Sequence, residues 1–281
     1  MEMKIRKAAF AGRFYPDDPK LIHAYMEHFL EKEQNKIKTM PESSVIIGGV
    51  VPHAGIMYSG YEAVHFYEIV RRSHQSFDTV VIVNPNHTGN GIGAYNTATY
   101  SHWATPLGTL ENDIDFQEAL DIPEYNLAHD SEHSGEVQLP FIQHFFDFHY
   151  KIVMITMNVQ HVDSAKILAE KIIEACRRTG KKMLLIASSD FNHYDSFQTG
   201  YTKDQYVIDE ILKNNPEGVY GAVKKHQVSA CGFGPIMTLL NVSRYFSANP
   251  AITLLRQGHS GEVRPSNQVV DYASFIATCD E

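Results

Sequence analysis

The stretch Thr-Val-Val-Ile-Val-Asn-Pro-Asn-His at residues 79–87 joins a β-branched, apolar run to a polar tail that ends in histidine. A run that is apolar on consecutive residues, rather than on alternate ones, is typical of a strand buried on both faces. We therefore predict a central strand over residues 79–83, with His87 just beyond its carboxyl end.

Similar runs recur along the chain, and helical patterns separate them. Further strands are predicted over residues 45–51, 152–157, 182–187, 252–255 and 269–276, and helices over residues 18–30, 60–72, 163–180 and 201–213. Strands that alternate with helices of this length indicate an α/β fold with a doubly wound, mostly parallel sheet and helices on both faces. Only a short connection precedes residue 269, so the last strand is a candidate antiparallel strand. No linker-like tract interrupts residues 1–281, which we expect to form a single domain.

The composition disfavours several functions. Lysine and arginine number 24 against 33 acidic residues, a net charge of -9, and no basic run offsets it, so we expect no nucleic-acid partner. We find no apolar stretch near the roughly 20 residues that a membrane span needs. We expect no membrane association and a cytoplasmic location. Three widely spaced cysteines argue against a disulfide framework, whereas 15 histidines direct attention to metal or acid-base chemistry.

Polar residues follow three of the predicted strands. His53 follows the strand at 45–51, His87 follows the strand at 79–83, and Asp190 and His193 follow the strand at 182–187. Open α/β sheets bind ligands beyond the carboxyl ends of their strands, so these four side chains are expected in one crevice. The two earlier histidines are candidate metal ligands, and His193 is a candidate general base or substrate hydrogen-bond donor oriented by Asp190. The alternatives are structural roles, with Asp190 capping the next helix.

Cys231 is the candidate third ligand. It precedes a predicted helix start at Pro235, where the helix dipole is expected to stabilise the thiolate that binds metals. The alternative is a small buried hydrophobic residue. Two histidines and one anion suit Fe(II), although copper or zinc accept the same ligands. Cys176 is expected to pack within a helix, and Cys279 to lie at a frayed terminus.

Residues 132–140 crowd polar side chains ahead of an aromatic run. His133 and Glu136 are candidates for the pocket wall, but the segment is equally typical of a helix start capped by Ser134. A Gly-x-Ser-x-Gly nucleophile elbow, a phosphate-binding loop and a dinucleotide fingerprint are missing from the sequence.

Seven groups of motifs resemble, in order, those of the Memo family. They are Ala-Gly-Arg-Phe-Tyr-Pro at 11–16, Pro-His-Ala-Gly at 52–55 with Tyr-Ser-Gly at 58–60, Pro-Asn-His-Thr-Gly at 85–89, Thr-Pro-Leu-Gly at 105–108, His-Ser at 133–134 with Glu-Val-Gln-Leu-Pro at 136–140, Ser-Ser-Asp at 188–190 with His-Tyr at 193–194, and Cys-Gly at 231–232 with Pro-Ile at 235–236. The resemblance implies a fold similar to class III extradiol, non-haem iron dioxygenases. It also implies roles for particular residues: His53, His87 and Cys231 as metal ligands, Asp190 and His193 as the acidic and acid-base positions, and Phe14 and Tyr58 as pocket-wall aromatics.

The family resemblance leaves the activity open. It implies links to iron or copper redox chemistry, and in microbial members partners such as a radical S-adenosylmethionine protein and an Ammecr1-like protein. A thiolate in place of the dioxygenases' glutamate argues against ring cleavage, because a thiolate is itself oxidisable. The leading hypothesis is an iron-dependent oxidoreductase or dioxygenase-like protein of unknown substrate. The alternatives are a non-catalytic protein that holds a small molecule, peptide or partner in the same crevice, and a zinc hydrolase with His193 or Asp190 as base.

Overall fold

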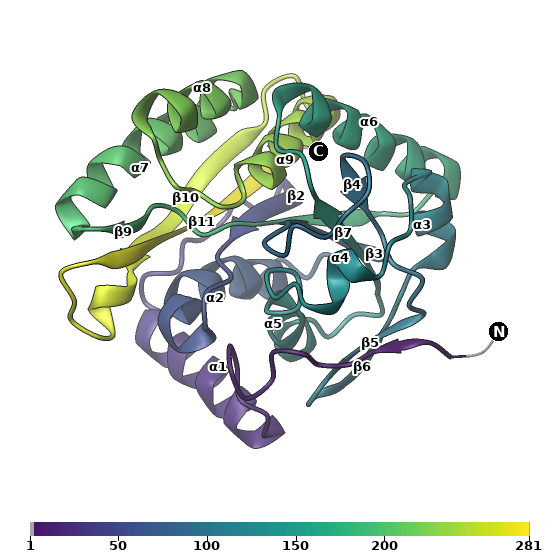
Figure 1. Cartoon of the computed structure of the whole chain (residues 1–281), viewed down its shortest axis with the longest axis horizontal. Helices are drawn as coiled ribbons and strands as arrows, with labels where there is room; N and C mark the ends of the chain where they lie inside the picture. Colours follow the sequence, from purple (N-terminus) through teal and green to yellow (C-terminus); the bar gives the residue numbers. More distant parts are fainter. Residues whose placement is uncertain (1–2, 281) are drawn as a thin grey trace.

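A large mixed sheet crosses the middle of the molecule in the computed structural model, which describes residues 3–280 (Figure 1). Its strand order is β10-β11-β2-β8-β3-β7-β4, and β9 pairs with β11. The strands are β2 (Ser44–Val51), β3 (Thr79–Pro85), β4 (Tyr95–Asn96), β7 (Lys151–Met157), β8 (Met183–Ser188), β9 (His193–Asp195), β10 (Ala251–His259) and β11 (Val269–Asp280). The four central strands run parallel, and antiparallel strands flank them on both sides.

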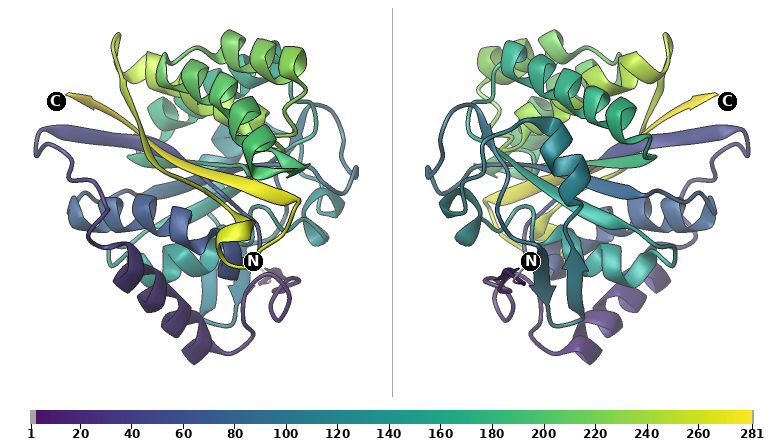
Figure 2. Two further views of the ribbon diagram at one scale, coloured as in Figure 1. Left: turned by 90° about the vertical axis from the view of Figure 1, so that its left-hand side faces the viewer. Right: turned by 90° about the vertical axis from the view of Figure 1, so that its right-hand side faces the viewer.

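Helices cover both faces of this sheet. Helices α1, α2 and α5 lie on one face, and α6, α7, α8 and α9 lie on the other (Figures 1 and 2). The helices are α1 (Pro19–Glu33), α2 (Ile56–Arg72), α3 (Ile114–Leu120), α4 (Leu127–Asp130), α5 (Gln138–Phe145), α6 (Val162–Thr179), α7 (Phe197–Leu212), α8 (Pro216–His226) and α9 (Phe233–Phe246). None of the described helices is long and apolar enough to cross a membrane.

Strand β3 shows why the central strands are apolar on consecutive residues. Val81 and Val83 belong to the hydrophobic core under α6 and α9, whereas Val80 and Ile82 belong to the core under α2 and α5. Successive side chains of a strand point to opposite faces, so a strand with a core on each side requires apolar residues throughout.

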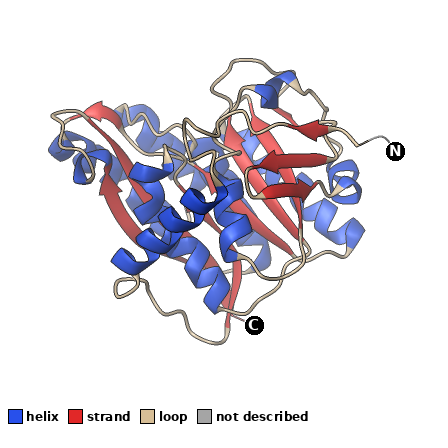
Figure 3. Cartoon of the chain, turned by 90° about the horizontal axis from the view of Figure 1, so that it is seen from below, coloured by secondary structure: helices blue, strands red, loops and turns tan. Residues whose placement is uncertain are grey.

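A second sheet of three short strands lies beside the N-terminus (Figure 3). In it β1 (Ile5–Arg6) pairs parallel to β5 (His102–Thr105), which pairs antiparallel to β6 (Gly108–Glu111). This sheet ties the N-terminal segment to the large sheet, because Asn112, which follows β6, bridges Ile152 at the start of β7.

The predicted strands and helices are all present, with shifted boundaries. Asp18 caps α1 by accepting a hydrogen bond from the Lys20 nitrogen (2.8 Å), as expected. The last strand is antiparallel to both its neighbours, and Cys176 packs against the core from α6. The frayed terminus expected at Cys279 is wrong, because this residue pairs with Val45 within the sheet. Helices α3 and α8 and the short strands were not predicted.

Candidate metal centre

The centre begins at the carboxyl ends of three neighbouring strands. Strands β2, β8 and β3 lie side by side, and His53, Asp190 and His87 each stand two residues beyond the last residue of their strand. The ring centroids of His53 and His87 are 5.3 Å apart, and Asp190 Oδ2 lies 3.9 Å from His53 Nε2. The expected crevice therefore brings these three side chains together.

A third imidazole completes the cluster. The ring of His133 lies 5.4 Å from that of His53 and 4.6 Å from that of His87, measured between centroids. One nitrogen from each ring lies within 4.8 Å of the other two. These three histidines can bind a metal ion, because neutral imidazole nitrogens are common ligands of several transition metals.

The tautomer of His53 follows from the bonds of Ser188. The Ser188 hydroxyl donates its one proton to the Ser134 carbonyl (2.7 Å) and accepts a bond from Gln138 Nε2 (2.9 Å). His53 Nδ1, 2.8 Å from the same hydroxyl oxygen, must therefore be the donor in that contact. The lone pair of His53 is thus on Nε2, which faces Cys231 Sγ at 3.1 Å.

Glu132 fixes His87 in the same way. One carboxylate oxygen accepts the His87 backbone N–H (2.6 Å), and the other lies 2.9 Å from His87 Nδ1. An ionised carboxylate only accepts, so Nδ1 donates and Nε2 is left free for a cation. Burial opposes the charge of Glu132, but the hydrogen bonds from His87 and Ser134 lower its pKa to about 2. A carboxylate behind a ligating histidine is a common feature of metal sites.

Two imidazoles of the cluster, those of His53 and His133, are held in their neutral form. Burial, followed by the positive charge that His87 can carry, lowers the pKa of His53 well below its ordinary value. Burial and the charge of His53 lower the pKa of His133 to about 3. At neutral pH both rings therefore keep a lone pair for a metal ion.

Cys231 reaches the cluster from the loop before α9. Its sulfur accepts the Asp190 backbone N–H at 3.3 Å, and its carbonyl accepts Gln160 Nε2 at 2.8 Å. Burial, followed by the charge of Asp190, raises the pKa of the thiol well above its ordinary value. This is opposite to the stabilised thiolate expected from the helix start, because burial outweighs the helix dipole. The thiol proton then bonds toward the lone pair of His53.

Asp190 and His193 flank the centre on the side of β9. Asp190 Oδ1 accepts the backbone N–H groups of His53 (2.7 Å) and Ala54 (3.2 Å), so this buried carboxylate shapes the loop that carries the first histidine. It does not cap α7, whose cap is Ser196. His193 is half-buried, and its Nδ1 donates to the Ser229 carbonyl (3.1 Å), which leaves Nε2 as a proton acceptor.

The N-terminal segment closes the opposite side. The ring of Phe14 packs on His133 with centroids 4.4 Å apart, and Tyr58 is half-buried in the first turn of α2. Glu136 lies behind this wall, where it accepts hydrogen bonds from Arg6, Tyr15 and the backbone nitrogens of residues 9 and 10. Its role in the structure is to anchor the segment that carries Phe14. The alternative, a helix start capped by Ser134, is wrong, because α5 begins only at Gln138.

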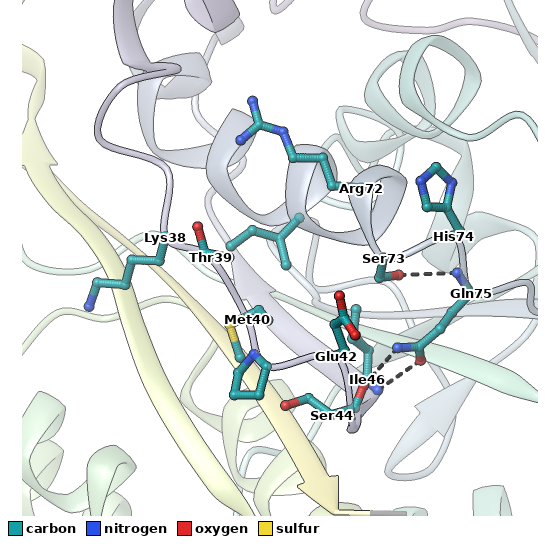
Figure 4. Close-up of a pocket in the computed structure, with 12 residues that line it drawn as sticks. Lys38, Thr39, Met40, Glu42, Ser44, Ile46, Arg72, Ser73, His74 and Gln75 are labelled. Carbon is teal, nitrogen blue, oxygen red and sulfur yellow. Dashed lines mark hydrogen bonds between the residues drawn. The ribbon is translucent and has the colours of Figure 1, made fainter.

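A separate cavity lies at the opposite end of the sheet. It has a volume of about 350 Å³ and lies between the loop before β2 and the end of α2 (Figure 4). The Gln75 side chain there accepts the Ile46 backbone N–H (3.0 Å) and donates to the Ser44 carbonyl (2.8 Å). Its amide is thus used to hold the strand, and we place the candidate site at the histidine cluster.

Sequence reasoning missed the residues that orient the ligands. Ser188 and Gln138 stand out in the sequence only as parts of motifs. The hydrogen bond that His87 donates to Glu132 joins residues 45 positions apart. The one signal that pointed to Glu132 was its place beside His133 in a polar segment. Hydrogen bonds of this kind depend on the fold and leave no local pattern.

The fold and the cluster define a class: a mixed α/β protein whose parallel strands end at a histidine site suited to a metal ion. Residues 6–276 match the family of Memo-like proteins, and the chain belongs to this family. Family membership confirms the resemblance carried by the seven groups of motifs.

Archaeal relatives match over nearly their full length. The MEMO1 family protein of Methanosarcina acetivorans is 36% identical over 282 residues, which cover 98% of this chain and 99% of the relative. That of Methanothermobacter thermautotrophicus is 37% identical, with 96% and 99% covered. That of Sulfolobus acidocaldarius is 38% identical, with 96% and 98% covered.

Among solved structures, an uncharacterised protein from Escherichia coli K12 is similar over 83% of this chain and 99% of that one. The sequence identity is 12% and the TM-score is 0.47.

Proposed function

We propose that the chain binds a redox-active transition metal, with iron(II) as the leading candidate, and acts as a metal-dependent oxidoreductase or dioxygenase-like protein. The observation that carries the proposal is the convergence of His53 and His87, whose ring nitrogens lie within 4.8 Å of each other and of a nitrogen of His133, with the Cys231 sulfur 3.1 Å from His53 Nε2. The substrate of this activity is not part of the proposal.

We assign His53, His87 and Cys231 as the ligands. The sulfur of Cys231 lies 3.1 Å from His53 Nε2, and one proton is shared across that contact. A cation that replaces this proton is bound by both atoms, and binding releases the proton to solvent because the thiolate is the form that ligates. His133, whose ring packs against that of Phe14 at a tilt, would then be left to hydrogen-bond a ligand of the metal.

Iron(II) in such a site supplies one-electron redox chemistry and Lewis acidity. The chain supplies the rest: Glu132 and Ser188 hold the two imidazoles in the ligating tautomer, and Asp190 holds the His53 loop. His193 uses Nδ1 on the Ser229 carbonyl, so Nε2 is the nitrogen of this ring that can face a substrate hydroxyl and take its proton.

Metal analysis of protein purified without oxygen tests the proposal. We expect one equivalent of iron in the wild type and in a His28→Ala control, whose histidine is exposed on α1, and a loss of iron in a His87→Ala variant. Cys231→Ala and His133→Ala then identify the third ligand, since only loss of a ligand greatly weakens binding. Undiminished iron in a His53→Ala, His87→Ala, Cys231→Ala triple variant would overturn the site.

A second candidate function is a zinc hydrolase, favoured by the three-histidine composition of the cluster. Three histidines and one open position form a known catalytic zinc site, in which the metal lowers the pKa of its water. Asp190 or His193 would then serve as base. One equivalent of zinc, retained in Cys231→Ala but lost in His133→Ala, together with esterase or amidase turnover, favours this function over the redox one.

A further inference from the structure

We propose a second, peripheral metal site where α1 meets α5, at which His23 and His144 bind one divalent transition-metal ion. Their Nδ1 atoms lie 2.8 Å apart, and no more than one proton fits between them. The ring centroids are 5.1 Å apart, so the two rings approach through these nitrogens rather than by stacking. None of the residues of the centre at His53 takes part.

Glu27 orients His144 for this role. It stands four residues after His23, one turn along the same face of α1. Its Oε1 lies 3.3 Å from His144 Nε2, and the His144 side chain is only 11% exposed. The nearby carboxylate favours a proton on Nε2 of the neutral ring, which leaves the lone pair of His144 on Nδ1, facing His23.

A metal ion can take the place of the shared proton without changing the charge of either imidazole. His23 Nδ1 is the donor in the present contact, because the His144 proton is on Nε2, beside Glu27. When the ion binds, the His23 proton moves from Nδ1 to Nε2, and both Nδ1 atoms become ligands.

The geometry selects among ions. With metal–nitrogen distances near 2.0–2.1 Å, two nitrogens 2.8 Å apart subtend an angle of roughly 84–89° at the metal. Ligands at right angles suit the square-planar or octahedral sites of Ni²⁺ and Cu²⁺, whereas tetrahedral Zn²⁺ requires the rings to move apart.

The surroundings leave room for further ligands. A cavity of about 400 Å³ adjoins the pair, lined by α1, α2 and α5, and it can admit the water ligands that two histidines leave vacant. Arg71 also lines it, but its guanidinium is bound to Glu68 at 2.7 and 2.6 Å, which offsets its positive charge. On the other side, the Phe145 ring lies 4.7 Å from that of His144 and limits its movement.

Calorimetric titration of the full chain with NiCl₂ tests this site. His23→Ala is the decisive variant because His23 is exposed, so its removal leaves the core intact, as far-ultraviolet circular dichroism verifies. His28→Ala is the matched control, with an exposed histidine on the same helix. We expect His23→Ala to bind one equivalent of Ni²⁺ fewer than the wild type and the control. We expect Glu27→Gln to keep the stoichiometry but to weaken this step about 10- to 100-fold.

The His23→Ala variant, the His28→Ala control and the wild type all contain His53, His87 and His133. Any Ni²⁺ bound at those histidines therefore contributes equally to each titration and does not affect the difference between them. An unchanged number of Ni²⁺ equivalents in His23→Ala would overturn the proposal. An equal loss in His28→Ala would overturn it too, since surface histidines would then bind the ion adventitiously.

Discussion

Asp204 of α7 and Asp271 of β11 place two buried carboxyl groups close enough that the charge of Asp271 helps to raise the pKa of Asp204. The pair supports Asn192, whose backbone N–H donates to Asp204 Oδ1 (3.0 Å) and whose carbonyl accepts the Asp271 N–H (2.8 Å). Asn192 stands between Asp190 and His193, so this contact between a helix and a strand holds the segment that flanks the candidate centre.

The carboxyl pair predicts a pH-dependent stability. Burial, with the charge of the neighbouring carboxylate, raises the pKa of Asp204, and burial raises that of Asp271. In the unfolded chain both titrate near 3.9. Below that pH both states are protonated and the full contribution is present. As the pH rises toward the raised folded values, the unfolded state loses protons first and stability falls, by up to about 1.4 kcal/mol per unit for each group.

Asp271→Asn should flatten this dependence. The amide keeps a polar group in place but removes one titrating carboxyl, while Asp195 and Lys203, the other charges that act on the pair, stay unchanged. Urea unfolding at several pH values between 5 and 8 measures the free energy of unfolding. Parallel profiles for the variant and the wild type would show that the two carboxyls do not cause the pH dependence.

Glu132→Gln should weaken metal binding at the centre about 10- to 100-fold. The change removes the charge that polarises His87 and replaces one of its two acceptor oxygens with a donor group. Metal affinity measured by competition with a chelator checks the expectation, with the exposed Glu31→Gln as control. Equal affinity in the two variants would show that the carboxylate does not orient the ligand.

Glu136→Gln should destabilise the fold by about 3–5 kcal/mol, because it leaves the buried guanidinium of Arg6 without a counter-charge. The same change should detach the segment that carries Phe14 from its anchor. Urea unfolding measures the loss. Adding Arg6→Met should recover part of it, since the double variant buries no unpaired charge. If the double variant is as unstable as the sum of its single changes, the pairing is not the cause.

Gly232→Ala should displace Cys231 and cost about 1–3 kcal/mol of stability. A Cβ at this position would overlap the Ser188 carbonyl oxygen and the Ser189 side chain, neither of which can move freely. Gly221→Ala is the matched control in α8, where a Cβ meets nothing within 4 Å and helix propensity favours alanine. Thermal unfolding measures the stability of the Gly232→Ala and Gly221→Ala variants, and the rate of thiol alkylation reports the displacement of Cys231. Identical behaviour would mean that the loop before α9 adapts.

Local patterns in the sequence were sufficient to predict the central strands and the positions of His53 and His87. The signal for the strands is strong because a strand between two cores must be apolar throughout. The signal for the two histidines is strong because each follows the point where such an apolar run ends. His133 was expected only in the pocket wall, since its approach to the other two rings depends on how the segment before α5 folds back. Helices α3 and α8 carry weaker patterns. The partner proteins implied by the family resemblance stay a prediction.

The spacing of two residues between strand and ligand has a consequence for insertions and deletions. A side chain beyond a strand keeps its direction only while the number of intervening residues is kept, since each added residue turns the next side chain toward the opposite face. One residue inserted at Pro52 or Asn86 would therefore point a histidine away from the cluster. Length changes in the loops at the other end of the sheet leave this alignment untouched, so that end is where the chain can vary in length without loss of the centre.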